Sequence, residues 1–182
     1  MRPSADQQSY SRPAIFFHWI IAVLIALAYF AIEIRGPKGS DSRAFWNSVH
    51  YWAGSLVLTL SVLRVLWRLW QGAPPELEEA RALTFLARLV HLMLYVFPIA
   101  QPLLGILTVN TDGRAFTLAG TALNIVLVAP DPVAHKLIHS THIFLGNAFY
   151  WVIGLHALAA IGHHLVFKDN TLRRMLGTSR AK

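Results

Sequence analysis

The chain has 182 residues, of which 55% are hydrophobic and only 14% are charged, and its formal net charge is +7. Soluble domains carry about 25% charged residues, and the positive residues of this chain lie between apolar runs instead of forming a polar surface for nucleic acid. The composition therefore favours a membrane protein, and the absence of cysteine excludes disulfides, iron–sulfur clusters, Cys-based zinc sites and covalently attached c-type haem.

Four apolar segments reach the length of about 20 residues that a helix needs to cross a bilayer. They cover residues 14–34, 45–69, 84–109 and 138–167. Stretches rich in Gly, Pro and Asp separate them, namely RGPKGSD, QGAPPELEE, and NTDG with APDP. We therefore predict one all-α domain over residues 1–182, an integral membrane four-helix bundle.

The first span contains Ala26-Leu27-Ala28, a triplet that resembles a signal-peptide cleavage site. Because the apolar run continues past this triplet and is long enough to span, we predict that the segment is retained.

Lys and Arg counts predict the orientation, since cytoplasmic loops are enriched in these residues. The two tails and the second loop with its flanks hold eleven of them, whereas the other two loops hold five. We therefore predict that both termini face the cytoplasm.

The third loop contains the segment AFTLAGTALNIVLV, residues 115–128. It is too short to span the bilayer. We predict that it lies at the outer interface as a short helix over the mouth of the bundle.

The region around the last span is unusual because KLIHSTHIFLGNAFYWVIGLHALAAIGHHLVFK carries five histidines. A polar ring inside hydrocarbon costs free energy unless something binds it. His142 and His156 are 14 residues apart, so on a helix they lie within about 40° of one face and about 21 Å apart along the axis. One helix can thus present imidazoles to two stacked macrocycles, one near each membrane surface.

Two haems need four axial ligands, and the first two spans supply the other histidines. We predict the pairs His50–His142 near the outer surface and His18–His156 near the inner one. Counting residues from the span ends separates His18 and His156 by about 10 Å in depth and makes His163 the better match. A His142–His163 pair, however, would place the two irons about 30 Å apart, which is long for fast transfer.

Other residues around these pairs have open interpretations. Gly54 and Gly146 lie one turn from His50 and His142 and leave room for a flat macrocycle or for helix packing. Arg64, one 14-residue step from His50, either binds a haem propionate or extends to the inner surface. Four further histidines belong to two less specific groups. His135 and His139 form a stripe with His142 that fits a transition metal, and His163 and His164 lie at the cytoplasmic boundary.

The chain resembles the prokaryotic cytochrome b-561 family, four-helix dihaem membrane cytochromes. The resemblance rests on FFHW, the EIRG and SDSR loop, NSVHYWAG, STHIFLGNAFYWVIGLHALAAIGHH and KDNTLRRML. It implies haem iron ligands at His18, His50, His142 and His156, which favours His156 over His163. It also implies a multi-pass protein of a bacterial inner membrane that contacts lipid and the quinone pool.

Within that family, the stand-alone members that this chain is most similar to are of the superoxide oxidase type. That resemblance implies a membrane-bound oxidoreductase that oxidises superoxide to O₂ at the periplasmic side and reduces ubiquinone. One alternative is a cytochrome b anchor subunit that relays electrons between quinol and a partner dehydrogenase or hydrogenase. A more remote alternative is a haem-free metal transporter. His91 is either a rival ligand or a hydrogen-bonding or quinone-contact residue, and we prefer the latter.

The outer loops carry cations that suit an anionic donor. Arg43 lies two turns before His50 and Lys136 six residues before His142, and Arg35, Lys38 and Arg114 lie on the same side. We predict that Arg43 and Lys136 steer superoxide toward the outer haem, although the same residues also fit ordinary loop charges. Glu33 and Asp41 are interpreted as loop carboxylates without a catalytic role.

Overall fold

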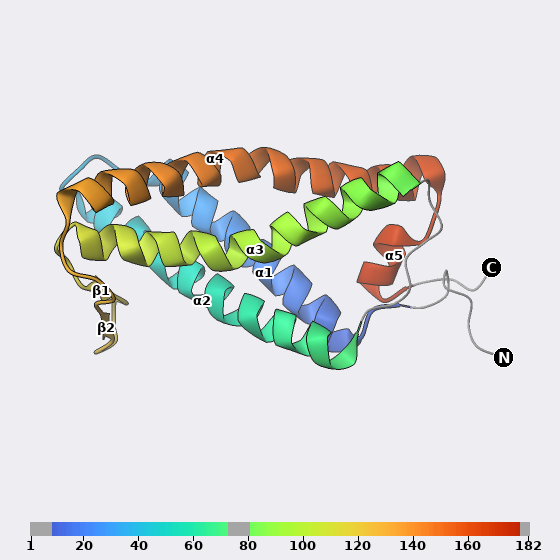
Figure 1. The fold of residues 1–182 in the computed structure, drawn as a ribbon, viewed down its shortest axis with the longest axis horizontal. Coiled ribbons are helices and arrows are strands. Elements are labelled where there is room, and N and C mark those ends of the chain that lie inside the picture. The colour runs from blue at the N-terminus through green and yellow to red at the C-terminus, as the bar shows by residue number, and fades with distance from the viewer. Residues whose placement is uncertain (1–8, 73–80, 179–182) are drawn as a thin grey trace.

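The computed structural model describes residues 9–72 and 81–178, which form a bundle of four long helices (Figure 1). These are α1 (Arg12–Ile34), α2 (Asp41–Gln71), α3 (Arg81–Thr111) and α4 (Pro132–Gly162). A π-helical turn, η2 (His163–Phe167), continues α4, and a short helix, α5 (Thr171–Leu176), follows it.

The four predicted spans are confirmed as helices. The segments Arg12–Ile34, Asp41–Gln71, Thr84–Thr111 and Pro132–Phe167 are long and apolar enough to cross a membrane. The last one begins six residues before the predicted position 138, because Asp131 caps it: its Oδ1 accepts from the backbone N–H groups of Val133 and Ala134 at 2.9 and 3.0 Å. Most of the QGAPPELEE stretch, residues 73–80, lies outside the described residues.

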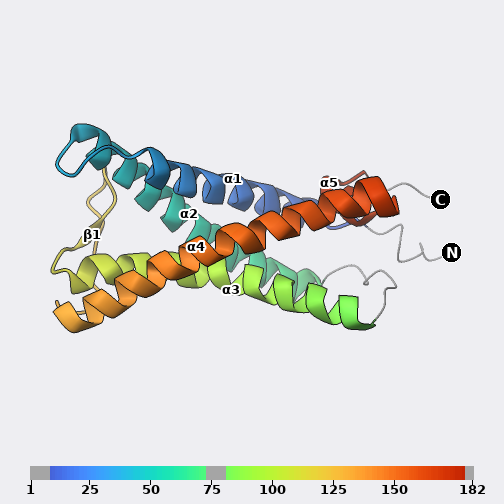
Figure 2. The same cartoon turned by 90° about the horizontal axis from the view of Figure 1, so that it is seen from above.

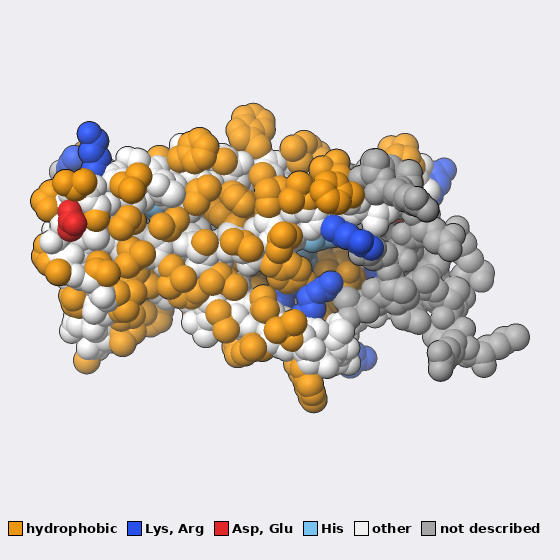
Figure 3. Space-filling view, viewed as in Figure 1, with side chains coloured by type: hydrophobic (Ala, Val, Ile, Leu, Met, Phe, Trp, Pro, Cys, Tyr) orange, Lys and Arg blue, Asp and Glu red, His pale blue; other side chains and the backbone are white. Residues whose placement is uncertain are grey.

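The helices form two antiparallel pairs, since α1 packs mainly on α2 and α3 mainly on α4. Figure 2 shows the α1–α2 pair well separated from the α3–α4 pair at the end where the small strands lie. The visible outer face is covered with hydrophobic side chains along its length, with Lys and Arg toward its two ends (Figure 3). An apolar lateral surface of this kind is what hydrocarbon solvates.

The two ends of the bundle differ. At one end, named here the α5 end, α5 packs on the beginning of α1: the Trp19 Nε1–H donates to the Met175 carbonyl at 3.0 Å, and the Tyr10 N–H donates to the Arg174 carbonyl at 3.3 Å. At the other, the hairpin end, lie the loops between α1 and α2 and between α3 and α4 (Figure 1). The hairpin end is the predicted outer side, and its orientation in a membrane stays a prediction.

The predicted interfacial helix at residues 115–128 is wrong. The segment instead forms an antiparallel hairpin of β1 (Phe116–Thr117) and β2 (Asn124–Ile125). Phe116 and Leu118 are buried against Ile106 and Val109 of α3, whereas the alternate residues are exposed. This period of two is that of a strand, and Gly120, with φ of 80°, adopts the left-handed conformation within the turn.

Candidate functional site

At the hairpin end, one histidine of the α1–α2 pair faces one of the α3–α4 pair. The ring centroids of His50 on α2 and His142 on α4 are 6.4 Å apart. Two imidazoles that bind one metal ion at about 2 Å each have centroids about 6 Å apart. The spacing of the two rings is therefore compatible with their binding one metal ion.

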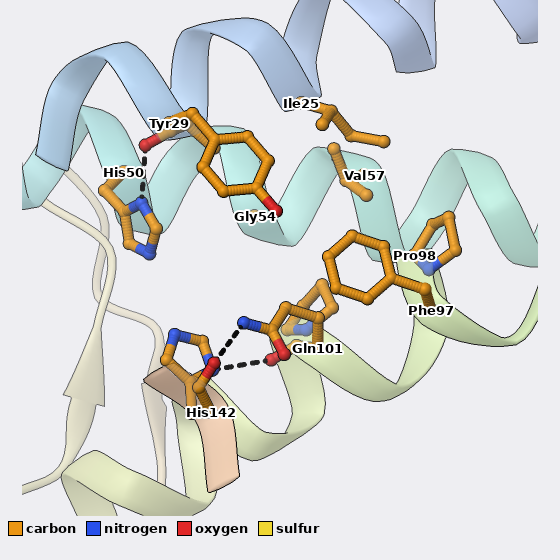
Figure 4. A pocket seen from close by; sticks show the side chains of 11 residues that line it. Ile25, Tyr29, His50, Gly54, Val57, Phe97, Pro98, Gln101 and His142 are labelled. Carbon is orange, nitrogen blue, oxygen red and sulfur yellow. Dashed lines mark hydrogen bonds between the residues drawn. The ribbon is translucent and has the colours of Figure 1, made fainter. Parts of the chain in front are cut away.

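Both rings at this end are oriented by backbone carbonyls. His50 Nδ1 lies 2.9 Å from the carbonyl oxygen of Ala28, and His142 Nδ1 lies 3.1 Å from that of Gln101 (Figure 4). Because a carbonyl only accepts, each Nδ1 carries the proton and each Nε2 is left as the lone-pair nitrogen. This tautomer and this type of partner are typical of metal-binding histidines.

A cavity of about 70 Å³ lies beside the two rings. All four long helices line it, through Ile25, Ala28, Tyr29, His50, Gly54, Val57, Phe97, Pro98, Gln101, Pro102 and His142. No atom lies within 4 Å of the position that a Cβ on Gly54 would take. Gly54 thus leaves open space, as a flat macrocycle requires, and the donor set and the apolar lining both fit a haem.

Gln101 is a member of this site that the sequence did not single out. Its side-chain Nε2–H donates to the backbone carbonyl of His142 at 2.7 Å, and its backbone carbonyl accepts from His142 Nδ1. Gly146 permits this approach, since a Cβ there would meet Gln101 Nε2 at 3.2 Å. The available signal was a polar amide between two prolines, in PIAQP, within an apolar span.

At the α5 end, the structure brings three histidines together. The centroid of His156 on α4 lies 6.4 Å from that of His18 on α1 and 5.7 Å from that of His91 on α3. The depth difference that residue counting assigned to His18 and His156 is therefore wrong, because α4 extends beyond the beginning of α1 at this end of the bundle (Figure 1). His163, the other candidate, is hydrogen-bonded instead to Asp169.

A basic group lies next to these three histidines. The guanidinium of Arg64 is 5.3 Å from the centroid of the Tyr95 ring, and that of Arg68 is 5.4 Å from the same centroid. Arg64 interacts electrostatically with His18 and His156. Within residues 9–72 and 81–178, no carboxylate forms a salt bridge with Arg64. Its charge suits an acidic group bound between the helices, such as a propionate.

The predicted histidine stripe on α4 has a different role in the structure. His135 and His139 stack with centroids 5.5 Å apart, and His135 Nδ1 lies 3.1 Å from the Thr108 carbonyl. Asp112 approaches His135 Nε2 to 3.9 Å, although the sequence placed no carboxylate on that face. Among the described residues, no group of three or more His, Asp or Glu could hold a metal ion.

The two predicted steering residues are placed differently. Arg43 donates from Nη1 to the Gly36 carbonyl at 2.9 Å and so helps to close its loop, whereas Lys136 is exposed on the first turns of α4. Arg114 forms a salt bridge with Asp112 at 2.9 Å.

The two presumed loop carboxylates lie within helices. Asp41 is the first residue of α2, and Glu33 lies in the last turn of α1, where it accepts a hydrogen bond from the Tyr150 hydroxyl at 3.0 Å. The interpretation of Glu33 as a simple loop charge is therefore wrong, because the apolar run of the first span extends beyond it.

Comparisons with known proteins cover nearly the whole chain. The family model for prokaryotic cytochrome b561 matches residues 9–178. A probable superoxide oxidase CybB from Yersinia pestis is 33% identical over 174 residues, which are 95% of this chain and 98% of that protein. Cytochrome b561 homolog 1 from Escherichia coli (strain K12) is 35% identical over 174 residues, 92% of this chain and 96% of the relative. Cytochrome b561 homolog 2 of the same strain is 29% identical over 168 residues, 90% and 88% of the two chains.

Proposed function

Because the chain belongs to the prokaryotic cytochrome b561 family, multi-pass inner-membrane proteins that bind haem b and transfer electrons, we propose that it binds two haems and is a superoxide:ubiquinone oxidoreductase. The name of the Yersinia pestis relative, a probable superoxide oxidase, supports this choice of donor. The net reaction consumes two superoxide anions, one ubiquinone and two protons, and it yields two O₂ and one ubiquinol.

The haem ligands in this proposal are His50 with His142 and His18 with His156. The observation that carries it is the repeated spacing: both pairs have ring centroids 6.4 Å apart, and both draw one histidine from α4. When bound, the haems supply the one-electron chemistry that side chains lack.

The side chains of the protein hold and orient the reacting partners. The carbonyls of Ala28 and Gln101 hold His50 and His142 in the metal-binding tautomer. The apolar lining of the cavity lowers the local dielectric constant, which strengthens electrostatic interactions within it. Arg64 balances the charge of a propionate at the α5 end, and Lys136 with Arg43 attracts the superoxide anion to the hairpin end.

The test begins with the absorption spectrum and the haem-to-protein ratio of the protein purified in detergent. Two b-type haems per chain support the cofactor proposal, and the absence of a Soret band contradicts it. The protein is then mixed with superoxide and ubiquinone, and ubiquinol formation is followed together with loss of superoxide. Haem reduction only by quinol, with copurification of a soluble dehydrogenase or hydrogenase subunit, would favour the anchor-subunit alternative instead.

A further inference from the structure

A carboxylate and two tyrosines connect α1 with α4 near the hairpin-end cavity. Tyr150 on α4 donates its hydroxyl hydrogen to Glu33 Oε1 at 3.0 Å, and its ring packs on that of Tyr29 with centroids 4.0 Å apart. Tyr29 in turn donates to the Gly146 carbonyl at 2.7 Å. These contacts span the seam between the two helix pairs, so they are specific to the folded bundle.

Glu33 is unusual in its position. Among the acids of the described spans, Asp41 begins α2, whereas Glu33 follows an apolar run of more than five turns in α1. Glu33 lies in the last turn of α1, at the boundary of the span, and Tyr150 of α4 holds its carboxylate there. A contact that is merely structural would not need an acid here, because a hydroxyl or an amide would accept the same hydrogen bond.

The group joins the lipid-facing surface to the wall of the cavity. Tyr150 is 41% exposed and Glu33 is exposed, with large apolar side chains exposed on both sides, among them Phe30 and Trp151. At the inner end, Tyr29 lines the cavity and follows Ala28, whose carbonyl orients His50. A molecule dissolved in the bilayer can therefore reach Tyr150 and Glu33. The ring of Tyr29 lies between Tyr150 and the cavity of the proposed haem site.

The chemistry of these groups favours the binding of a quinone and disfavours the binding of superoxide. A phenol hydroxyl and a protonated carboxyl donate hydrogen bonds to the carbonyl oxygens of a neutral ring, and the exposed apolar side chains accommodate its hydrocarbon tail. The carboxylate form of Glu33 would repel the superoxide anion. Reduction of a quinone also consumes protons, and a carboxyl group can transfer protons to a bound ring.

We propose that Glu33 and Tyr150 bind the headgroup of ubiquinone at the α1–α4 seam and that Glu33 donates the protons for its reduction. This inference rests on the proposed function. In each of two turns, one electron derived from superoxide reaches the quinone, the O–H bond of the Glu33 carboxyl breaks, and an O–H bond forms at a quinone oxygen. Water at the hairpin end then returns a proton to Glu33. After two turns, two superoxide anions have become two O₂ and the quinone has become quinol.

The test compares Glu33→Gln and Tyr150→Phe with wild-type protein loaded with haem. Glu33→Gln keeps the size of the side chain and a hydrogen-bond acceptor but removes the acid, and Tyr150→Phe keeps the ring and removes the hydroxyl. Matched controls are Asp41→Asn, at the start of α2, and Tyr51→Phe, whose ring packs on Phe116 of the hairpin. Three quantities are measured: haem reduction by superoxide, ubiquinol formation, and photolabelling by an azido-ubiquinone followed by peptide mapping.

We expect both variants to keep the wild-type spectrum and the wild-type rate of haem reduction by superoxide. Ubiquinol formation should fall at least tenfold in Glu33→Gln, and the apparent KM for ubiquinone should rise in Tyr150→Phe. The label should attach to α1 and α4 near Glu33 and Tyr150 in wild-type protein and decrease in both variants. Wild-type kinetics and unchanged labelling in the variants would overturn the site. A wild-type protein that is reduced by superoxide but forms no ubiquinol would overturn the proposed acceptor and this site together.

Discussion

The two histidine pairs have the same spacing but different surroundings. At the hairpin end, His50 and His142 are each tied to a backbone carbonyl and border a cavity that all four long helices line. At the α5 end, no hydrogen bond of the described chain orients the ring of His18 or His156, and a third histidine and Arg64 lie close by. Backbone carbonyls thus orient both rings of the hairpin-end pair, whereas within the described residues no such contact orients the rings of the α5-end pair.

The difference shows that ring spacing alone does not define a rigid site. A ligand that has lost its rotational freedom in the apoprotein binds metal at a lower entropic cost. We therefore expect the hairpin-end pair to bind haem more tightly and the α5-end pair to tolerate changes around it. Four experiments test this contrast, in order of decreasing effect.

The largest effect should come from removing a ligand. Replacing His142 or His50 by Ala should remove the hairpin-end haem, and replacing His18 or His156 should remove the other, as counted from the haem-to-protein ratio and the spectrum of the remaining haem. His91→Ala is the critical comparison, because this residue also neighbours His156. If His91→Ala loses a haem while His18→Ala keeps both, the α5-end pair is His91–His156 and the proposed pairing is wrong.

A smaller effect should follow from Gln101→Leu, which removes the bond from Nε2 to the His142 carbonyl but keeps the side-chain size. Loss of such an outer contact typically lowers metal affinity about 10–100-fold. The change should be confined to the hairpin-end haem, measured by haem titration and by the redox potentials of the two haems. The α5-end haem of the same protein is the control. Equal changes at both haems would show that the substitution disturbs the whole bundle.

Charge removal at the hairpin end should change rates and leave the haem content intact. The double variant Arg43→Gln, Lys136→Gln should slow haem reduction by superoxide about tenfold and flatten its dependence on ionic strength. Arg114→Gln is the matched control, since Asp112 already pairs with that charge. Reduction by a neutral quinol should hardly change. Equal slowing with both donors would mean that the substitutions damage the haem site and do not act by steering.

The smallest effect concerns Asp169, just beyond η2 at the α5 end. Burial raises the pKa of this carboxyl, but hydrogen bonds from His163 and from Thr171 outweigh burial and hold the pKa below its usual value. The resulting stabilisation is present above the ordinary Asp pKa of about 3.9 and is lost as pH falls through the lowered value. Asp169→Asn should therefore flatten the pH dependence of the thermal midpoint in this acidic range. An unchanged pH profile would show that the contact contributes nothing to stability.

Much of the fold was predictable because hydrocarbon allows few choices. An apolar segment of sufficient length must be helical, so the four spans followed from the sequence. The proposed ligand histidines stood out as polar rings within those spans. Gln101 and Tyr150 did not, since their roles depend on which helices become neighbours.

The hairpin of β1 and β2 shows the opposite case. Residues 115–128 are apolar and short, and such a segment fits a surface helix or a pair of strands by length alone. The alternation of Phe116 and Leu118 with Thr117 and Ala119 was one local signal for strands. Phe116 and Leu118 are buried against Ile106 and Val109 of α3. This packing surface cannot be recognised from the sequence until the position of α3 is known.

The contribution of α4 to both histidine pairs also bears on biosynthesis. A ribosome completes this helix after the other three long ones, so a nascent chain that has inserted only α1, α2 and α3 contains neither His142 nor His156. Under the proposed ligand assignment, haem delivery would follow the emergence of the last span, and both sites would become available at the same stage of synthesis. A chain arrested before α4 would therefore lack one histidine of each pair.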